Sequence, residues 1–193
     1  VAHVVSSSKF ARKCEEAGVD AIVAEGFEAG GHNGREETTT LTLIPQVRRA
    51  TCLPVVAAGG IGSGEAMLAA MALGAEGVQI GTLFALSAES SASEAFKQRC
   101  LALDEGGTML CLKKLSPTRL VRNGLFDKVA EAEARGANSE ELRDILGKAA
   151  SKRGIFEGDT EQGELEIGQI VSSVDAIRPA GDIVRQLVED FRK

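Results

Sequence analysis

A glycine-rich turn, Gly59–Gly64, is the part of the sequence best suited to binding an anion. It follows an apolar run, residues 54–58, that is typical of a buried strand, and it precedes a helical pattern over residues 65–73. Backbone N–H groups at such a turn attract a phosphate, and glycine lets the phosphate approach closely. No lysine follows, so this is not a Walker loop, and the glycine spacing does not match a dinucleotide fingerprint. Alone, the turn is equally consistent with a tight connection between strand and helix.

A second turn strengthens the phosphate interpretation. Gly81 and Thr82 directly follow the next strand-like run, residues 77–80. In (β/α)₈ barrels a phosphate commonly binds between the last two loops that follow strands. By that analogy the two turns together predict a phosphate site, with Gly59, Gly60, Gly81 and Thr82 as candidate contacts.

The loop Glu25–Gly34 is the other place where chemistry can occur, because it also follows a strand-like run. Its paired Gly30 and Gly31 let the backbone pass close to a flat ligand. His32, one of two histidines, is a side chain suited to proton transfer near neutral pH. The alternative is a solvated histidine in a flexible loop. The second histidine, His3, lies inside a strand-like run, where a hydrogen-bonded core residue is the more frequent role.

The remaining polar side chains carry no catalytic pattern. The aspartates show no spacing typical of a metal site, so no metal is expected. The four cysteines are far apart and match neither a zinc motif nor a disulfide framework. Buried free thiols in a reducing cytoplasm are the simplest interpretation, and they favour a cytoplasmic location. The four cysteines are Cys14, Cys52, Cys100 and Cys111.

Composition excludes two classes of partner. The chain has 22 Lys and Arg against 28 Asp and Glu, a net charge of −6, and no basic stripe that would fit a nucleic acid. No apolar run is long enough to cross a membrane. The first residues, Val1–Val5, are strand-like and lack an initiator Met, which predicts that the chain is a fragment of something longer.

Strand-like and helical patterns alternate four times in the first half of the chain, which is typical of a parallel α/β sheet. The expected strands are residues 1–5, 21–24, 54–58 and 77–80. The expected helices are residues 8–17, a segment that begins near Pro45 and ends near Ala50, and residues 65–73. Gly18 is suited to end the first helix, since glycine is favoured just past a helix C-terminus.

The character of the sequence changes after Leu86. Residues 90–103 are expected to be helical, followed by charged helices over 125–135 and 140–150 and a last amphipathic helix over 183–192. Asn138 and Glu141 have the spacing of a capping box. This pattern predicts a helical insert over residues 105–160 that forms a lid above the C-terminal ends of the strands. Residues 161–193 are then expected to return and pack on the barrel.

Four motifs, in this order, resemble those of the nitronate monooxygenase (2-nitropropane dioxygenase) family and the related FMN-dependent enoyl-acyl-carrier-protein reductases. Glu25–His32 resembles the segment after their sixth barrel strand, and Val55–Ile61 resembles their seventh strand and phosphate loop. Gly77–Phe84 resembles the eighth strand and its turn, and residues 158–170 resemble the C-terminal return to the barrel. The resemblance therefore implies the C-terminal half, strands five to eight, of a (β/α)₈ TIM barrel, with residues 1–104 forming half of an FMN-binding barrel.

The same resemblance implies site residues. His32 matches the catalytic histidine of the family, and His3 matches a histidine near the flavin. The implied FMN contacts are His3, Gly31, Gly59, Gly60, Gln79, Gly81 and Thr82. FMN supplies the redox chemistry in such enzymes, and the protein positions and tunes it.

Two enzyme functions fit these motifs. In the first, the family resemblance implies an FMN-dependent oxidoreductase that oxidises alkyl nitronates with O₂, with His32 handling the proton of a neutral nitroalkane. In the second, an enoyl-acyl-carrier-protein reductase uses NAD(P)H as co-substrate, and His32 protonates the enoyl α-carbon. A non-catalytic, phosphate-binding half-barrel is the alternative from a different class. All three of these alternatives are compatible with a homodimer.

Overall fold

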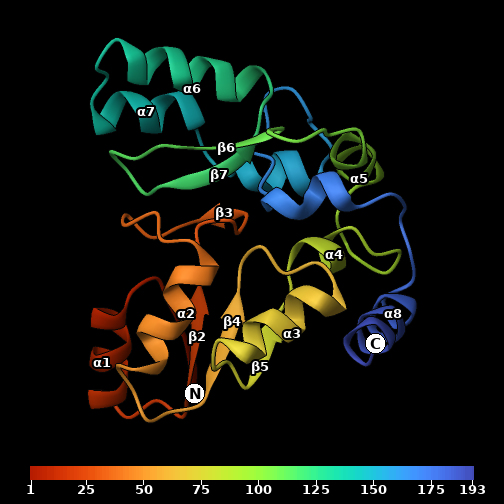
Figure 1. Ribbon diagram of the computed structural model, residues 1–193. Helices are drawn as coiled ribbons and strands as arrows, with labels where there is room; N and C mark the ends of the chain where they lie inside the picture. The colour runs from red at the N-terminus through yellow and green to blue at the C-terminus, as the bar shows by residue number, and fades with distance from the viewer.

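The computed structural model describes residues 1–193 and has at its base a sheet of four parallel strands. Their order in the sheet is β1-β2-β4-β5, so neighbouring strands follow one another in space as they do along the chain (Figure 1). The bounds are β1 (Ala2–Val5), β2 (Ala21–Glu25), β4 (Val55–Ala58) and β5 (Gly77–Gln79). The α/β class and the four predicted strands are thereby confirmed.

The helices between these strands cover one face of the sheet. They are α1 (Ser8–Glu16), α2 (Thr40–Arg48) and α3 (Gly64–Ala72), and the short α4 (Thr82–Ala85) follows β5. Alternate strand residues such as Ile22, Ala24 and Val55 pack against α1 and α2 and form one apolar core with them. At roughly 25 cal/mol per Å² of apolar surface buried, this core is what holds the sheet to its helices.

The position of Pro45 differs from the prediction. The helix begins at Thr40, after the N-cap residue Thr39, so Pro45 lies in the second turn rather than the first. The start is fixed from outside the helix, because the Thr40 N–H donates to both carboxylate oxygens of Glu28 at 3.0 Å. This anchor sets where the helix begins despite the proline, which favours a first-turn position.

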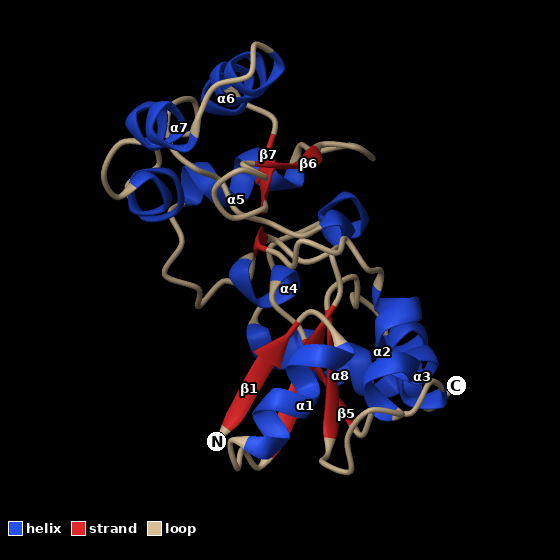
Figure 2. Ribbon diagram, turned by 90° about the vertical axis from the view of Figure 1, so that its left-hand side faces the viewer, coloured by secondary structure: helices blue, strands red, loops and turns tan.

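A second, smaller sheet lies beyond the C-terminal ends of the four parallel strands (Figures 1 and 2). It is antiparallel, with order β3-β7-β6, and its strands are β3 (Gly31–His32), β6 (Thr108–Cys111) and β7 (Thr118–Val121). The segment predicted as a helical insert over 105–160 is not helical at residues 108–121, which form a hairpin. All four residues of β7 are buried, including the charged Arg119, so this strand lacks the alternation that identifies a half-exposed strand in a sequence.

The remaining helices are divided between this second sheet and the parallel sheet. Figure 1 shows α6 and α7 stacked on its outer side, while α8 returns to the parallel sheet and packs on α3. Their bounds are α5 (Glu94–Leu101), α6 (Gly124–Ala134), α7 (Ser139–Leu146) and α8 (Ala180–Phe191), with a π-helical turn η1 (Lys152–Phe156) and a 3₁₀ turn η2 (Gln169–Ser173). The predicted helix over 140–150 stops early, because Gly147 takes a left-handed backbone conformation with φ of 66°.

The N-terminus of α7 tests the capping prediction. The side-chain oxygen of Asn138 accepts the N–H groups of Glu140 and Glu141 at 2.9 and 3.0 Å. We expect Asn138→Ala to lower the free energy of unfolding by ~1 kcal/mol, because two backbone donors lose their acceptor. Urea unfolding measures the change, and Asn138→Ser, which keeps an acceptor oxygen, is the control. Equal stability of the two variants would contradict this account of the cap.

The cysteines are only partly as predicted. All four are free, but Cys52 is exposed and Cys14 is half-buried. Burial raises the pKa of the Cys100 and Cys111 thiols to about 12, so these two stay protonated and inert near neutral pH. The interpretation as buried thiols therefore holds for Cys100 and Cys111 and is wrong for Cys52.

Candidate functional site

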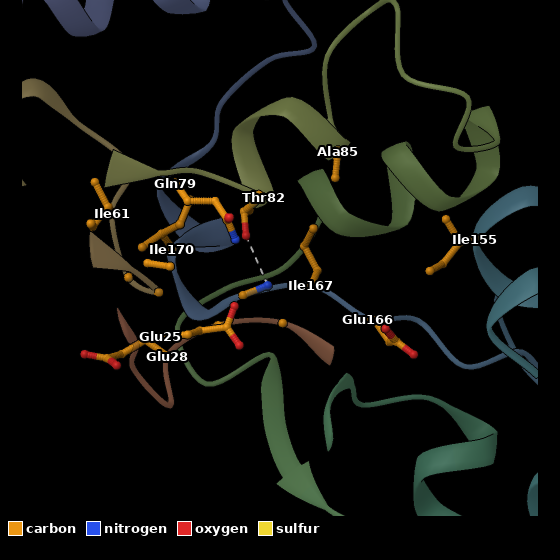
Figure 3. Close-up of a pocket in the computed structure, with 17 residues that line it drawn as sticks. Glu25, Glu28, Ile61, Gln79, Thr82, Ala85, Ile155, Glu166, Ile167 and Ile170 are labelled. Atoms are coloured by element: carbon orange, nitrogen blue, oxygen red, sulfur yellow. Dashed lines mark hydrogen bonds between the residues drawn. The ribbon is translucent and has the colours of Figure 1, made fainter. Parts of the chain in front are cut away.

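A pocket of about 220 Å³ lies where the C-terminal ends of the parallel strands meet the segment that returns from the second sheet. The strand ends contribute Glu25, Ala58 and Gln79 to its wall, and the turns that follow β4 and β5 contribute Gly59, Gly60, Gly81 and Thr82. The opposite wall is Glu166–Gly168, in what we call the return segment, residues 164–169. Figure 3 shows Gln79 and Thr82 at one end of this pocket and Glu166 at the other.

The two glycine turns present free donors to the pocket. The backbone N–H groups of Gly59, Gly60, Gly81 and Thr82 donate to no acceptor within the protein. Gly59 has φ of 88°, and a Cβ built there would lie 2.6 Å from the carbonyl oxygen of Gly26, so the turn can take this course only with glycine. Clustered N–H groups without protein acceptors are what a phosphate requires. These residues therefore fit the phosphate end of a flavin mononucleotide.

The return segment is tied to both walls of the pocket. The Gly168 N–H donates to the hydroxyl oxygen of Thr82 at 3.1 Å, the bond drawn in Figure 3, and the Gln169 N–H donates to the carbonyl oxygen of Glu28 at 2.9 Å. A Cβ at Gly30 would lie 2.4 Å from the carbonyl carbon of Ile167. The two backbones are thus in close contact, and the pocket is closed on this side by residues distant in sequence.

Hydrogen bonds also connect the loop after β2 with the phosphate turn. The Thr40 hydroxyl has three acceptors within reach, the Glu28 carboxylate at 3.1 Å and the carbonyl oxygens of Ala58 and Gly59 at 3.2 and 2.8 Å. Glu28 in turn lines the pocket. Glu28 and Thr40 therefore set the position of Gly59 and are part of the structure that shapes the site.

Glu25 is a pocket residue that the sequence analysis did not select. It ends β2 and lies in register with Ala58, which lies in register with Gln79, so all three occupy one row across the sheet. Its carboxylate has no hydrogen-bond partner in the protein, and burial raises its pKa above the ordinary value. A half-buried acceptor without a partner is suited to a hydroxyl or N–H donor of a ligand. The only signal in the sequence was its position as the last residue of a strand before a glycine.

His32 lies near the pocket but does not line it. It is exposed and forms β3 with Gly31, paired in register with Thr118 of β7, while the preceding Ala29 and Gly30 do line the pocket. Gly31 is buried outside the wall, and a Cβ there would lie 2.7 Å from a carboxylate oxygen of Glu166. The predicted catalytic loop is therefore next to the pocket, and His32 lies two residues beyond Gly30, which lines it.

A buried arginine holds this loop in place. Arg119 of β7 is only 2% exposed, and its Nε and Nη2 atoms donate to the carbonyl oxygen of Phe27 at 3.1 and 2.7 Å. Its guanidinium also stacks over the Phe27 ring, 5.0 Å from the centroid. Burial lowers the pKa of Arg119, although the nearby carboxylates of Glu28 and Glu37 oppose that change.

His3 is not brought to this site. It pairs in register with Ile22, so both lie on the face of the sheet that packs against α1 and α2. Its side chain is exposed, and its Nδ1 lies 2.8 Å from the carbonyl oxygen of Val4. Of the eight predicted site residues, the structure gathers five around one pocket: Gly59, Gly60, Gln79, Gly81 and Thr82. Gly31 and His32 are adjacent to it, and His3 is separate.

Two other features concern possible partners. No group of three or more histidine, cysteine, aspartate or glutamate side chains is placed to hold a metal ion. None of the helices combines the length and the apolar character needed to span a bilayer.

Known proteins are similar to this chain in sequence and in fold. A nitronate monooxygenase of Neurospora crassa is 32% identical over 98% of the chain, which covers 53% of that protein. The structure of FabK from Thermotoga maritima superposes with a TM-score of 0.93 and 38% identity, covering 100% of this chain and 60% of that one. A nitroalkane oxidase from Streptomyces ansochromogenes gives a TM-score of 0.79 and 33% identity, covering 99% and 57% respectively.

These matches run along almost the whole chain, yet the chain spans only about half the length of the curated relatives it matches. The family model described as nitronate monooxygenase matches residues 1–190. The named relatives include a nitronate monooxygenase and a nitroalkane oxidase, which are oxidoreductases. The chain belongs to the nitronate monooxygenase family.

Proposed function

We propose that this chain is the FMN-binding part of an oxidoreductase that oxidises alkyl nitronates with O₂. The observation that carries the proposal is the group of free N–H donors at Gly59, Gly60, Gly81 and Thr82, at the ends of two adjacent parallel strands. In this proposal residues 1–104 supply strands five to eight of an eight-stranded barrel, and residues 161–193 pack back on them. Residues 105–160 lie over the C-terminal ends of the strands as a lid.

The proposal assigns a role to the polar groups that line the pocket. The two glycine turns bind the phosphate, and Thr82 also holds the return segment through its hydroxyl oxygen. Glu25 and Gln79 share a row across the sheet. In this proposal Glu25 accepts hydrogen bonds from polar atoms of the cofactor, and Gln79 donates hydrogen bonds to them. The bound flavin supplies the two-electron redox chemistry. Gly31 and His3 make no contact with the cofactor in this scheme, because neither lines the pocket.

His32 handles the proton at the rim of the site. A neutral nitroalkane must lose a proton before it becomes a nitronate, and an imidazole is suited to accept it near neutral pH. The backbone next to His32 is fixed by the pairing with Thr118 and by the contact of Arg119 with Phe27. A histidine on such a braced segment can be held in a constant orientation toward the pocket opening.

A second candidate function has its own support. The likeness to FabK, at a TM-score of 0.93, exceeds that to the nitroalkane oxidase, at 0.79. This favours an enoyl reductase in which NAD(P)H is the reductant and His32 protonates the α-carbon of the enoyl substrate. Both candidates use the same phosphate turns, so the cofactor site does not discriminate between them.

The two candidates are separated by what reduces the flavin. The complete protein that contains this chain is purified and mixed anaerobically with ethyl nitronate or, separately, with NADPH and NADH, while flavin absorbance is followed. Rapid bleaching by the nitronate, with none by the nicotinamides, is the result expected of the monooxygenase. The reverse pattern establishes the reductase. A colourless protein that does not take up added FMN contradicts both and supports a non-catalytic, phosphate-binding protein.

A further inference from the structure

Two carboxyl groups contact one serine beside the pocket, and neither of the two candidate enzyme functions assigns them a role. The Ser151 hydroxyl oxygen lies 2.9 Å from Oε2 of Glu164 and 2.9 Å from Oε1 of Glu166. Glu164 is buried, with 8% of its surface exposed, whereas Glu166 is half-buried and lines the pocket. The three side chains therefore form a continuous path from the interior to the pocket wall.

The number of hydrogen atoms in this path determines its chemistry. A serine hydroxyl carries one hydrogen and can donate it to only one of its two carboxyl neighbours. With both carboxyls ionised, the other contact would place two oxygen lone pairs 2.9 Å apart without a proton between them. A proton on Glu164 removes this conflict, because Glu164 then donates to Ser151 and Ser151 donates to Glu166.

The surroundings of Glu164 shift the pKa of its carboxyl group upward. Burial raises the pKa of its carboxyl group, and the charge of Glu166 raises it further, while the Ser151 hydroxyl, His32 and Arg153 oppose the rise. The nearby Cys111 is uncharged near neutral pH. The residues that face Glu164 from β3, β6, η1 and the return segment thus leave its pKa, on balance, above the ordinary value.

The backbone places this path beside the loop Glu25–Gly34, which carries His32. The return segment pairs with β7 along the same edge as β3, through a bridge between Leu120 and Glu166 and a bond of 2.9 Å from the Val121 N–H to the carbonyl oxygen of Leu165. Glu166 therefore follows Gly31 along that edge, and its Oε2 lies 2.7 Å from the position of a Gly31 Cβ. Figure 3 shows Glu166 at the end of the pocket away from the phosphate turns.

We propose that Glu164, Ser151 and Glu166 hold one shared proton and deliver it to the pocket at Glu166. In the delivery step the Glu164 O–H proton moves to the Ser151 oxygen, the Ser151 proton moves to Oε1 of Glu166, and Glu164 is left ionised. The neutral Glu166 then offers its proton to a base, either the His32 imidazole beside the pocket or a developing carbanion of a substrate in the pocket. No electrons are transferred, and the reverse sequence stores a proton. Use of this proton in turnover rests on the proposed function, but its presence does not.

Infrared spectroscopy of the complete protein tests the shared proton without flavin or substrate. At pH 7 we expect the carbonyl stretching band of a protonated carboxylic acid, which disappears as the pH is raised. Glu164→Gln should abolish this band, and Glu105→Gln, at an exposed position, should leave it unchanged. Absence of the band in the unaltered protein, or its persistence in Glu164→Gln, would overturn the proposal.

Turnover tests the delivery through Ser151. Ser151→Ala removes the bridging hydroxyl and should slow the proton-dependent step by ~10²-fold, the lower end of the effect of a general acid or base. Ser151→Thr keeps the hydroxyl and should restore the rate and its pH profile, provided that both variants show the circular dichroism of the parent. An alanine variant as fast as the parent would overturn the delivery step. Because the infrared band is measured independently, failure of the flavin chemistry is distinguishable from failure of the proton store.

Discussion

Replacing His32 with alanine is expected to lower turnover of a neutral nitroalkane by ~10²–10⁴-fold, the usual contribution of a general acid–base group. The imidazole is the group that accepts the substrate proton in the proposed function, and methyl cannot replace it. Flavin content should stay unchanged, because His32 does not line the pocket that holds the phosphate turns. Steady-state rates and the ratio of flavin to protein absorbance measure the two effects.

The two histidines of the chain provide a matched control. His3→Ala makes the same change at an exposed site on the helix-covered face of the sheet, and it should leave the rate unaltered. A preformed nitronate needs no deprotonation, so its turnover should fall less in His32→Ala than that of the nitroalkane. Near-normal rates of His32→Ala on both substrates would identify His32 as an ordinary loop residue.

Replacing Gly81 with aspartate is expected to weaken FMN binding about a thousandfold. A carboxylate within about 4 Å of a phosphate charge costs roughly 4 kcal/mol at an effective dielectric constant near 20. Gly81 suits this experiment better than Gly60, because a Cβ at Gly81 meets no atom within 4 Å and its φ is −96°. At Gly60, where φ is 70°, any side chain would strain the backbone and confuse the result.

The control for this change is Gly81→Asn, which has nearly the same size as aspartate and no charge. Fluorescence titration of the apoprotein with FMN should give a much higher Kd for the aspartate variant than for the asparagine variant. If the two bind FMN equally, the phosphate does not lie at this turn. If riboflavin, which lacks the phosphate, is affected as strongly as FMN, the effect is steric and the charge argument fails.

The parallel sheet was predictable because its strands are short apolar runs that alternate with helical patterns. Strand β2, for example, is such a run, and the helix before it ends just ahead of Gly18, which has a positive φ. The hairpin of β6 and β7 was not predictable in the same way. β7 is buried on both faces, and its largest side chain is a charged arginine whose partner, the Phe27 carbonyl, lies 92 positions away. Local sequence patterns do not report such distant pairings.

The same distinction between local patterns and distant contacts applies to the residues of the candidate site. Gly59, Gly60, Gly81 and Thr82 were predicted, because a glycine turn after a strand is a local pattern with a local cause. Glu25 and the carboxyl pair of Glu164 and Glu166 were missed, since their roles depend on burial and on contact with segments that are remote in sequence. His3 is the opposite case. Its residue type suggested a function, but the register of β1 places it on the helix-covered face of the sheet, away from this pocket.

The return segment has a consequence for how the protein is made. The pocket wall joins Thr82 to Gly168, 86 positions later, so this part of the site consists of contacts of long sequence separation. Such contacts form late in folding, after the local strand–helix units have assembled. On the ribosome the parallel sheet can therefore form while the pocket is still open, because the residues that close it are synthesised later. In the proposed function, capture of the cofactor in its final geometry then follows completion of residues 164–169, and hydrogen exchange during refolding should report protection there after the parallel sheet.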